Sequence, residues 1–180
     1  MVRAVEVPGL GTFSEGPHGD LVSQSRTIGA LGGRQCHFLF EGFEGDPHPE
    51  DFIQAVQNLL AADRTLLAGA TQYVHQYCVD MQKLWGNEAP TLDISEPADV
   101  WRYVDLGTEL CVSRDHGAGR DVFVSLECNC AWEVEHGLQL VFRNGREISK
   151  VGPFDGHVSN ESAYANERLK GVVYKRLGEL

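Results

Sequence analysis

The sequence predicts an α+β fold, in which an antiparallel β-sheet carries a helical hairpin on one face. Strand-like segments occupy the beginning of the chain, a helical region spans about residues 49–85, and strand-like segments return after residue 100. Runs of strands and runs of helices, rather than a regular βαβ alternation, are typical of this class. A chain of 180 residues is long enough for one core, so we expect a single domain over residues 1–180.

The clearest strand signal lies between residues 122 and 132. Its even-numbered positions form the more apolar set: Val122, Val124, Leu126, Cys128, Cys130 and Trp132. A period of two indicates a strand with one buried face. We therefore expect Cys128, Cys130 and Trp132 to be buried on the face against which the rest of the domain packs.

A second strand pair is expected nearer the N-terminus. Residues 20–31 are followed by Gly32-Gly33, and Cys36, Phe38 and Phe40 then occupy every second position. Two consecutive glycines can adopt positive φ at a turn, so the pattern predicts a β-hairpin.

The helical region is expected to begin near Pro49, because proline suits the first turn of a helix and acidic residues follow it. Apolar residues three or four positions apart extend to about Ala62. Asp63 is the expected N-cap of a second, longer helix that ends at Gly86. These segments form either a helical hairpin or one long helix bent at Ala62-Asp63.

The turn at Arg143-Asn144-Gly145 should fix the register of the next strand pair. A three-residue loop made of these residues places Leu140 opposite Ile148, whereas a two-residue Asn-Gly loop places Leu140 opposite Ser149. We expect the three-residue loop, because it continues the apolar face across the pair.

The composition excludes several partners. The chain has 15 Lys and Arg against 26 Asp and Glu, a formal net charge of -11, so its surface repels nucleic-acid phosphates and anionic lipid. No apolar run approaches the roughly 20 residues of a membrane helix, and the N-terminus lacks the apolar core of a signal peptide. We expect a cytoplasmic protein without nucleic-acid or membrane partners. A partner recognised through charge should be a basic protein or a cation.

The five cysteines are an odd number without a repeated spacing, which favours reduced thiols over a disulfide framework. Cys128 and Cys130 fall on the expected core face of an acidic protein. A nucleophilic thiol needs an exposed, electropositive setting, so small buried apolar residues are the better interpretation.

Two short segments contain the residues that could carry chemistry, and together they define a candidate cluster. Its members are Trp132, Glu133, Glu135, His136, Asp155 and His157. If the hairpin over residues 138–151 is regular, its open ends lie side by side and bring the two histidines close together.

The candidate cluster has two interpretations. In the first, His136, Asp155 and His157 bind a divalent metal and Glu133 or Glu135 is the general base of a hydrolase. In the second, the same residues form a hydrogen-bonded turn network, with Asp155 accepting backbone N–H bonds. The chain has no HExxH or other fixed metal spacing, so we expect no cofactor and favour the network.

The segments VSLECNCAWEVEHGLQLVFRNG and VGPFDGHVSN resemble an uncharacterised bacterial domain-of-unknown-function family that shares the motifs W-E-x-E-H-G-L-Q and V-G-P-x-D-G-H. The resemblance extends from about Gly11 to Tyr174. It implies a small intracellular α+β protein and assigns no activity to any residue.

We expect a non-enzymatic binding or immunity-type module that recognises a basic protein partner. The immunity-type role rests on analogy with small bacterial families that inhibit toxins. The alternative is the metal-dependent hydrolase built on His136, Asp155 and His157, and a third interpretation is a domain that serves only assembly. No oligomeric state is predicted.

Overall fold

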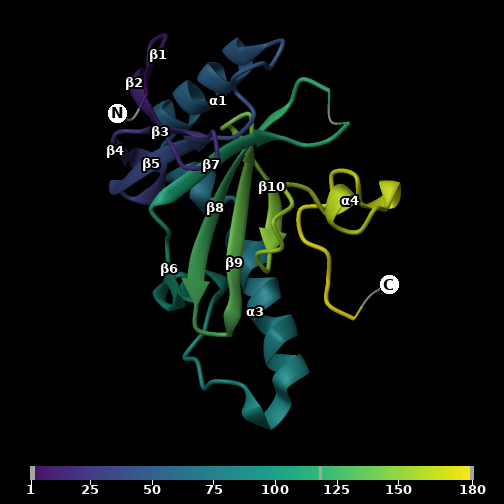
Figure 1. Ribbon diagram of the computed structural model, residues 1–180. Helices are drawn as coiled ribbons and strands as arrows, with labels where there is room; N and C mark the ends of the chain where they lie inside the picture. Colours follow the sequence, from purple (N-terminus) through teal and green to yellow (C-terminus); the bar gives the residue numbers. More distant parts are fainter. Residues whose placement is uncertain (1–2, 118, 179–180) are drawn as a thin grey trace.

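A computed structural model describes residues 3–117 and 119–178, in which ten strands form one sheet with helices packed on one face (Figure 1). The strands are β1 (Ala4–Val7), β2 (Gly11–Glu15), β3 (Leu21–Ser23), β4 (Arg26–Ile28), β5 (Arg34–Phe40), β6 (Val104–Asp105), β7 (Glu109–Arg114), β8 (Val122–Cys130), β9 (Glu133–Arg143) and β10 (Glu147–Gly152). The α-helices are α1 (Pro49–Ala61), α2 (Arg64–Ala68), α3 (Thr71–Trp85) and α4 (Asn160–Ala163). The 3₁₀ helices are η1 (Gly29–Leu31), η2 (Gly86–Glu88), η3 (Pro97–Tyr103) and η4 (Glu167–Leu169).

The fold is α+β, as the sequence predicts, but its sheet is mixed. The strand order is β1-β2-β3-β5-β7-β8-β9-β10, with β4 paired to β5 and β6 paired to β8. All of these pairs are antiparallel except β5 and β7. The chain leaves β5, forms α1 to α3 and returns beside β5, and such a crossover is what a parallel pair requires.

The helical region begins at Pro49, as predicted, and Asp63 caps the helix that follows. Its Oδ1 accepts a hydrogen bond of 2.9 Å from the backbone N of Thr65. The longer helix is interrupted at Gly69-Ala70 and therefore forms α2 and α3, since glycine is a poor residue for a helix interior. None of the helices within the described ranges has the length and apolar character needed to cross a bilayer.

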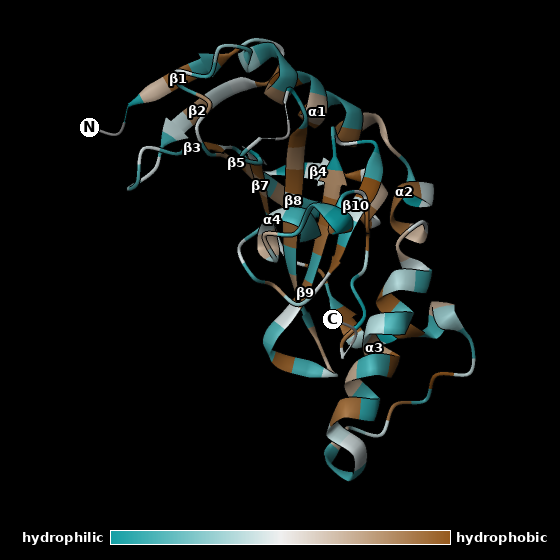
Figure 2. Ribbon diagram, turned by 90° about the vertical axis from the view of Figure 1, so that its right-hand side faces the viewer, coloured by the Kyte–Doolittle hydropathy of each residue, from teal (hydrophilic) through white to brown (hydrophobic). Residues whose placement is uncertain are grey.

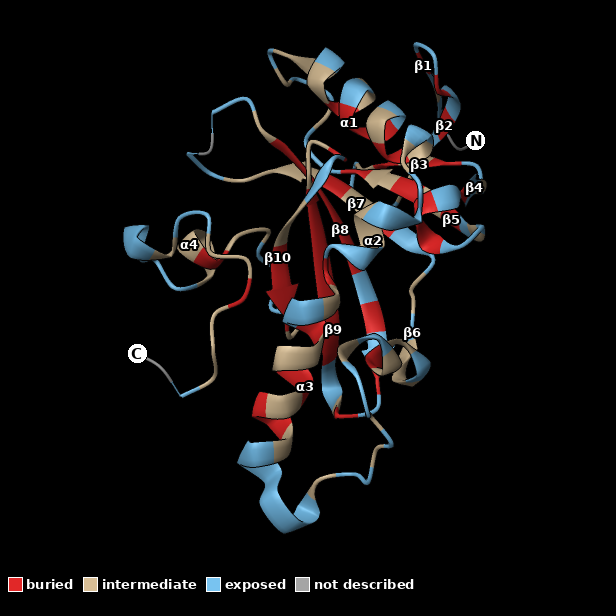
Figure 3. Ribbon diagram, turned by 180° about the vertical axis from the view of Figure 1, so that it is seen from behind, coloured by how far each residue is buried: buried red, intermediate tan, exposed pale blue. Residues whose placement is uncertain are grey.

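The core lies between α1 to α3 and the adjoining face of the sheet, where buried residues gather on β8 and β9 (Figure 3). Hydrophobic positions recur along the same strands (Figure 2). Cys128, Cys130 and Trp132 are 2%, 6% and 2% exposed, which confirms their predicted burial. The ring of Tyr77 on α3 meets the Trp132 ring edge-on at 5.9 Å. The Tyr77 hydroxyl also donates a 3.0 Å hydrogen bond to the carbonyl of Gly137, so α3 is fixed to β9 by both apolar and polar contacts.

The predicted hairpin near the N-terminus is confirmed. β4 pairs with β5 so that Ile28 lies opposite Arg34. The intervening loop contains η1 and both glycines, whose φ angles are +73° and +84°.

Both registers considered for the β9–β10 hairpin are wrong, because Leu140 lies opposite Val151. The loop consists of residues 144–146, one position later than expected. A β-bulge between Ile148 and Lys150 then shifts the pairing by one more residue. Contacts of the loop with other parts of the fold explain this difference in register. Asn144 accepts a 2.9 Å hydrogen bond from the backbone N of Val122 through its side chain. Gly145 lies so close to α1 that a Cβ atom would come within 2.0 Å of the Ala55 carbonyl oxygen.

A bulge separates the two ends of the β8–β9 pair. Cys128 lies opposite Leu138, whereas Cys130 lies opposite Glu133. Gly137 sits in this bulge with φ of +62°, and a Cβ atom there would lie 2.3 Å from the Cys128 carbonyl oxygen. Only glycine fits this position, which gives a structural reason for the glycine in the EHGLQ segment.

The C-terminal segment lies along the outer edge of β10. The backbone N of Val151 donates a 2.8 Å hydrogen bond to the carbonyl of Val173. The side chain of Asn160, which is only 4% exposed, donates to the carbonyls of Val172 and Val173. The Tyr174 hydroxyl donates a 3.0 Å bond to Asp80 on α3, so this segment is tied to both the sheet and the helices.

Candidate functional site

The face of the sheet opposite the helices carries a set of polar side chains that the strand register brings together. His37 on β5 lies opposite Glu109 on β7, and Cys111 on β7 lies opposite Ser125 on β8. Glu127 on β8 lies opposite Gln139 on β9. These residues alternate with the core residues of the same strands, so they necessarily point away from the helices.

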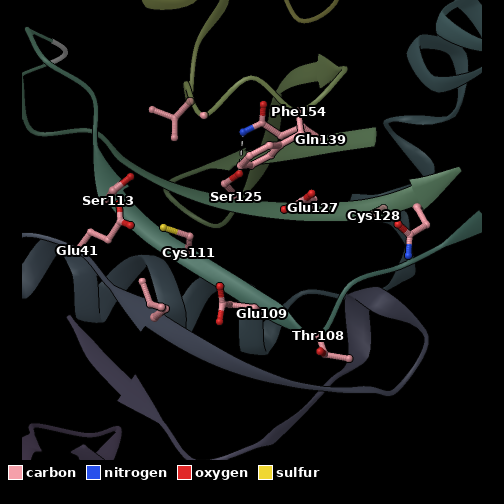
Figure 4. A pocket seen from close by; sticks show the side chains of 14 residues that line it. Glu41, Thr108, Glu109, Cys111, Ser113, Ser125, Glu127, Cys128, Gln139 and Phe154 are labelled. Carbon is pink, nitrogen blue, oxygen red and sulfur yellow. Dashed lines mark hydrogen bonds between the residues drawn. The ribbon is translucent and has the colours of Figure 1, made fainter. Parts of the chain in front are cut away.

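These side chains line a groove of about 470 Å³ that we call the acidic groove (Figure 4). Glu41, Glu109 and Glu127 contribute three carboxylates to it. Phe154 and Val158, from the loop after β10, line it as well. The groove therefore combines charged walls with an apolar portion contributed by the 153–158 loop.

The three carboxylates of the acidic groove lack strong cationic partners. Among the ion pairs of the described residues, none joins a lysine or an arginine to Glu41, Glu109 or Glu127. The ring of His37 lies beside Glu109, with Nε2 and Oε2 3.0 Å apart. The groove thus holds more negative than positive charge.

The thiol of Cys111 lies near these negative charges. Burial raises its pKa, and the charge and hydrogen bond of Glu41, together with the charge of Glu109, bring it to about 12. The thiol is therefore protonated at neutral pH, and a protonated thiol is neither a nucleophile nor a metal ligand.

The buried side chain of Lys150 forms hydrogen bonds to the loop after β10, which borders one end of the groove. The side chain of Lys150 is 1% exposed, and its ammonium donates to Gln139 Oε1 at 2.9 Å, Asp155 Oδ1 at 2.5 Å and the His157 carbonyl at 2.9 Å. These acceptors use all three of its N–H groups. Burial lowers the pKa of Lys150, and the neighbouring carboxylate of Asp155 opposes this shift.

Gln139 extends this network into the groove. Its Nε2 donates to the Ser125 hydroxyl at 2.9 Å and to the His157 carbonyl at 3.0 Å. Together, Lys150 and Gln139 bind the 153–158 loop to the face of the sheet.

The structure divides the predicted candidate cluster into a buried residue and two local pairs. Trp132 belongs to the core. Glu133 accepts a 2.9 Å bond from the backbone N of Glu135, and its Oε2 lies 3.5 Å from Nδ1 of His136. Glu135 and His136 are themselves exposed.

The second pair is Asp155 and His157, in the loop after β10. Asp155 Oδ1 accepts a 2.9 Å bond from the backbone N of His157, and the ring Nδ1 of His157 lies 3.0 Å from the Asp155 carbonyl oxygen. The ends of the hairpin do meet, because the backbone N of Phe154 donates to the His136 carbonyl at 3.2 Å. Even so, within residues 3–117 and 119–178 no three His, Cys, Asp or Glu side chains converge as a metal-ligating group.

The residues of the acidic groove are not marked by any local pattern in the sequence. Glu127 and Ser125 are among the polar positions of the central strand, but Glu41 directly follows β5 and Glu109 lies on β7. Finding the groove required knowing that these strands are adjacent. Of the predicted segments, only the one around Asp155 borders it, through Gly156.

Carboxylates at the start of α1 provide a contrast to the groove. Arg114 lies 2.6 Å from Asp46 and 3.1 Å from Asp51, and Arg120 lies 2.6 Å from Asp51 and 3.1 Å from Glu50. Hydrogen bonding from Arg120, together with Arg114, lowers the pKa of Asp51 to about 2. Each carboxylate of this cluster is paired with an arginine of the chain, whereas the carboxylates of the groove are not.

Fold and site together define an α+β domain with an acidic groove on the open face of its sheet. Residues 10–158 match the family described as Domain of unknown function (DUF6985), and the chain belongs to that family. The matched region contains every groove residue named above. Comparison with the curated proteins gives no match, and comparison with the solved structures gives none either.

Proposed function

We propose that this protein is a non-enzymatic binding module whose acidic groove recognises a basic segment of a protein partner. The observation that supports this most directly is that Glu41, Glu109 and Glu127 share one groove without a lysine or arginine partner among the described residues. A basic ligand would supply the missing positive charge.

The arrangement of the strands places carboxylates where a bound cation would reduce their mutual repulsion. Leu110 on β7 lies opposite Leu126 on β8, and continuing this register by one residue would place Glu109 opposite Glu127. Like charges directly opposite in a sheet are destabilising. A cation bound between them would replace this repulsion by attraction, and the net charge of -11 would speed its approach.

The hydrolase interpretation receives less support from the geometry. It requires His136, Asp155 and His157 to converge, whereas His136 contacts Glu133 on β9 and His157 contacts Asp155 in the loop after β10. Metal analysis of protein purified without a histidine tag tests it directly: near-stoichiometric metal that is lost in His136→Ala would overturn our proposal. An immunity-type inhibitor, whose partner is the basic surface of a toxin, is a special case of the binding module.

The proposed function is tested with a fluorescent nonalysine peptide as the probe. We expect binding at about 50 mM salt that weakens strongly at about 500 mM, because exposed charges are screened over a shorter distance. The groove variant carries Glu41→Gln, Glu109→Gln and Glu127→Gln. Its affinity should fall about tenfold, in line with the loss of close charge pairs at an interface.

A matched control separates groove recognition from net charge. Glu88→Gln, Glu135→Gln and Glu167→Gln remove the same number of charges from exposed positions outside the groove. Binding to this control should remain close to that of the wild type. Equal weakening in both triple variants, or nonalysine binding that does not depend on salt, would contradict the proposal.

A further inference from the structure

The acidic groove has features that a simple patch of negative charge lacks. Its wall includes the aromatic ring of Phe154 and the apolar side chains of Leu39 and Val158. Lys150 and Gln139, both about 1% exposed, hold the loop that carries Phe154 against the sheet. The apolar and charged portions are thus kept in one cavity by a buried hydrogen-bond network.

Ser125 supplies an independent indication of a ligand. It is only 6% exposed, lines the groove and accepts a hydrogen bond from Gln139 Nε2. Among the described residues, no acceptor receives the hydrogen of its own hydroxyl group. Because Ser125 lines the groove, its O–H group is available to an acceptor that a ligand brings, such as a carbonyl oxygen.

We propose that the acidic groove anchors an arginine side chain of a peptide segment. The guanidinium lies between Glu109 and Glu127, the aliphatic stem lies along Phe154 and Leu39, and a carbonyl of the same segment accepts the Ser125 hydroxyl. This inference rests on the proposed function and makes it more specific, because it names one side chain as the anchor.

Arginine fits these features better than lysine. Its planar guanidinium has five donors that can serve two carboxylates at once, and it stacks on aromatic rings. Its methylene groups can cover apolar surface while the charged end reaches the carboxylates. Lysine is a compact, strongly hydrated charge and would gain less from Phe154.

The test uses three capped tripeptides as probes: acetyl-Gly-Arg-Gly-amide, acetyl-Gly-Lys-Gly-amide and acetyl-Gly-citrulline-Gly-amide. Citrulline has nearly the shape of arginine without its charge. Binding is followed by the NMR shifts of the Gln139 side-chain amide and the backbone amide of Gly156, which border the groove. We expect the arginine probe to bind at least about threefold more tightly than the lysine probe, given its stacking and paired hydrogen bonds, and the citrulline probe to cause no shift.

Two variants locate the anchor. Phe154→Leu keeps an apolar side chain but removes the ring, and should weaken the arginine probe about two- to fivefold. Ser125→Ala should weaken the arginine and lysine probes alike, because the carbonyl acceptor is common to both. Tyr164→Leu is the matched control, since Tyr164 is an exposed aromatic residue outside the groove, and it should bind like the wild type.

The outcomes separate this inference from the function on which it rests. Equal binding of the arginine and lysine probes, no effect of Phe154→Leu, or shifts that spare Gln139 and Gly156 would each overturn the arginine anchor. Any of these results can occur while nonalysine still binds in a groove-dependent manner, in which case the acidic groove keeps its proposed role. Loss of groove dependence for nonalysine would overturn both. Thermal unfolding of each variant, expected to match the wild type within a few degrees, confirms that the fold is intact.

Discussion

The ammonium of Lys150 lies 2.5 Å from the carboxylate of Asp155, although the lysine side chain is 1% exposed. An ion buried in this way is stabilised only if its charge and its hydrogen bonds are both satisfied. Here one carboxylate supplies the opposite charge, and Gln139 and the His157 carbonyl supply the remaining acceptors. The pair therefore joins β10 to the loop that borders the acidic groove.

Lys150→Met should lower the free energy of unfolding by about 1–3 kcal/mol, because it removes the donor to Gln139 Oε1 and the charge that pairs with Asp155. The cost should stay below that of a fully buried pair, since Asp155 is 32% exposed and water can reach it. Urea unfolding monitored by circular dichroism measures the change. Lys170→Met, at an exposed position, is the control and should have little effect. A Lys150→Met protein as stable as the wild type would show that the network does not stabilise the fold.

Cys128→Ser should destabilise the protein by about 1–3 kcal/mol, because it buries a hydroxyl without an assured partner. Cys128 is 2% exposed, and burial raises its pKa to about 12. Cys111→Ser, at a half-buried position of the groove, should cost less. Rapid modification of Cys128 by a thiol reagent in the native protein would contradict its place in the core.

Asp51→Asn should make the protein less sensitive to acid. The pKa of Asp51 is lowered from 3.8 to about 2, so its carboxylate contributes stability above about pH 4 that is lost as the pH falls towards 2. At pH 7 the variant should be less stable by about 1–2 kcal/mol, through weaker hydrogen bonds to Arg114 and Arg120.

Denaturant midpoints between pH 7 and pH 2 test this expectation for Asp51. Across the window from pH 4 to pH 2, the midpoint of Asp51→Asn should fall less steeply than that of the wild type. The Glu88→Gln control should follow the wild-type curve. Parallel curves for Asp51→Asn and the wild type would show that Asp51 is not responsible for the acid sensitivity.

Glu41→Gln should lower the pKa of Cys111, because it removes a negative charge that favours the protonated thiol and replaces a carboxylate acceptor by a weaker amide oxygen. Alkylation by iodoacetamide as a function of pH, read out at Cys111 by peptide mass spectrometry, measures this. The variant should react at lower pH than the wild type, and Glu88→Gln should not. An unchanged profile would mean that burial alone sets the pKa and that the groove has little negative potential.

The sequence predicted features that depend on nearby residues. The burial of Cys128 and Trp132 follows from a period of two, and the start of the first helix at Pro49 follows from proline and the carboxylates after it. The register at Leu140 could not be predicted in the same way. It depends on a bulge near Ser149 and on the contacts of Asn144 with Val122 and of Gly145 with α1.

The candidate site was predictable only in part, for a related reason. The segment around Asp155 and His157 does form a hydrogen-bonded turn, and its glycine borders the groove. Glu41 and Glu109, by contrast, are separated by more than sixty positions in the chain and line one groove only because β5 and β7 run side by side. A parallel pair across a helical crossover leaves no local pattern that distinguishes it from two unrelated strands.

The hydrogen bond from Val151 to Val173 has a consequence for behaviour in concentrated solution. β10 is the last strand of the sheet, and an uncovered last strand offers free N–H and C=O groups to the same strand of another molecule. The C-terminal segment occupies part of that edge and is held there by Asn160 and by Tyr174. Its backbone therefore lies where the edge strand of a neighbouring molecule would otherwise pair with β10.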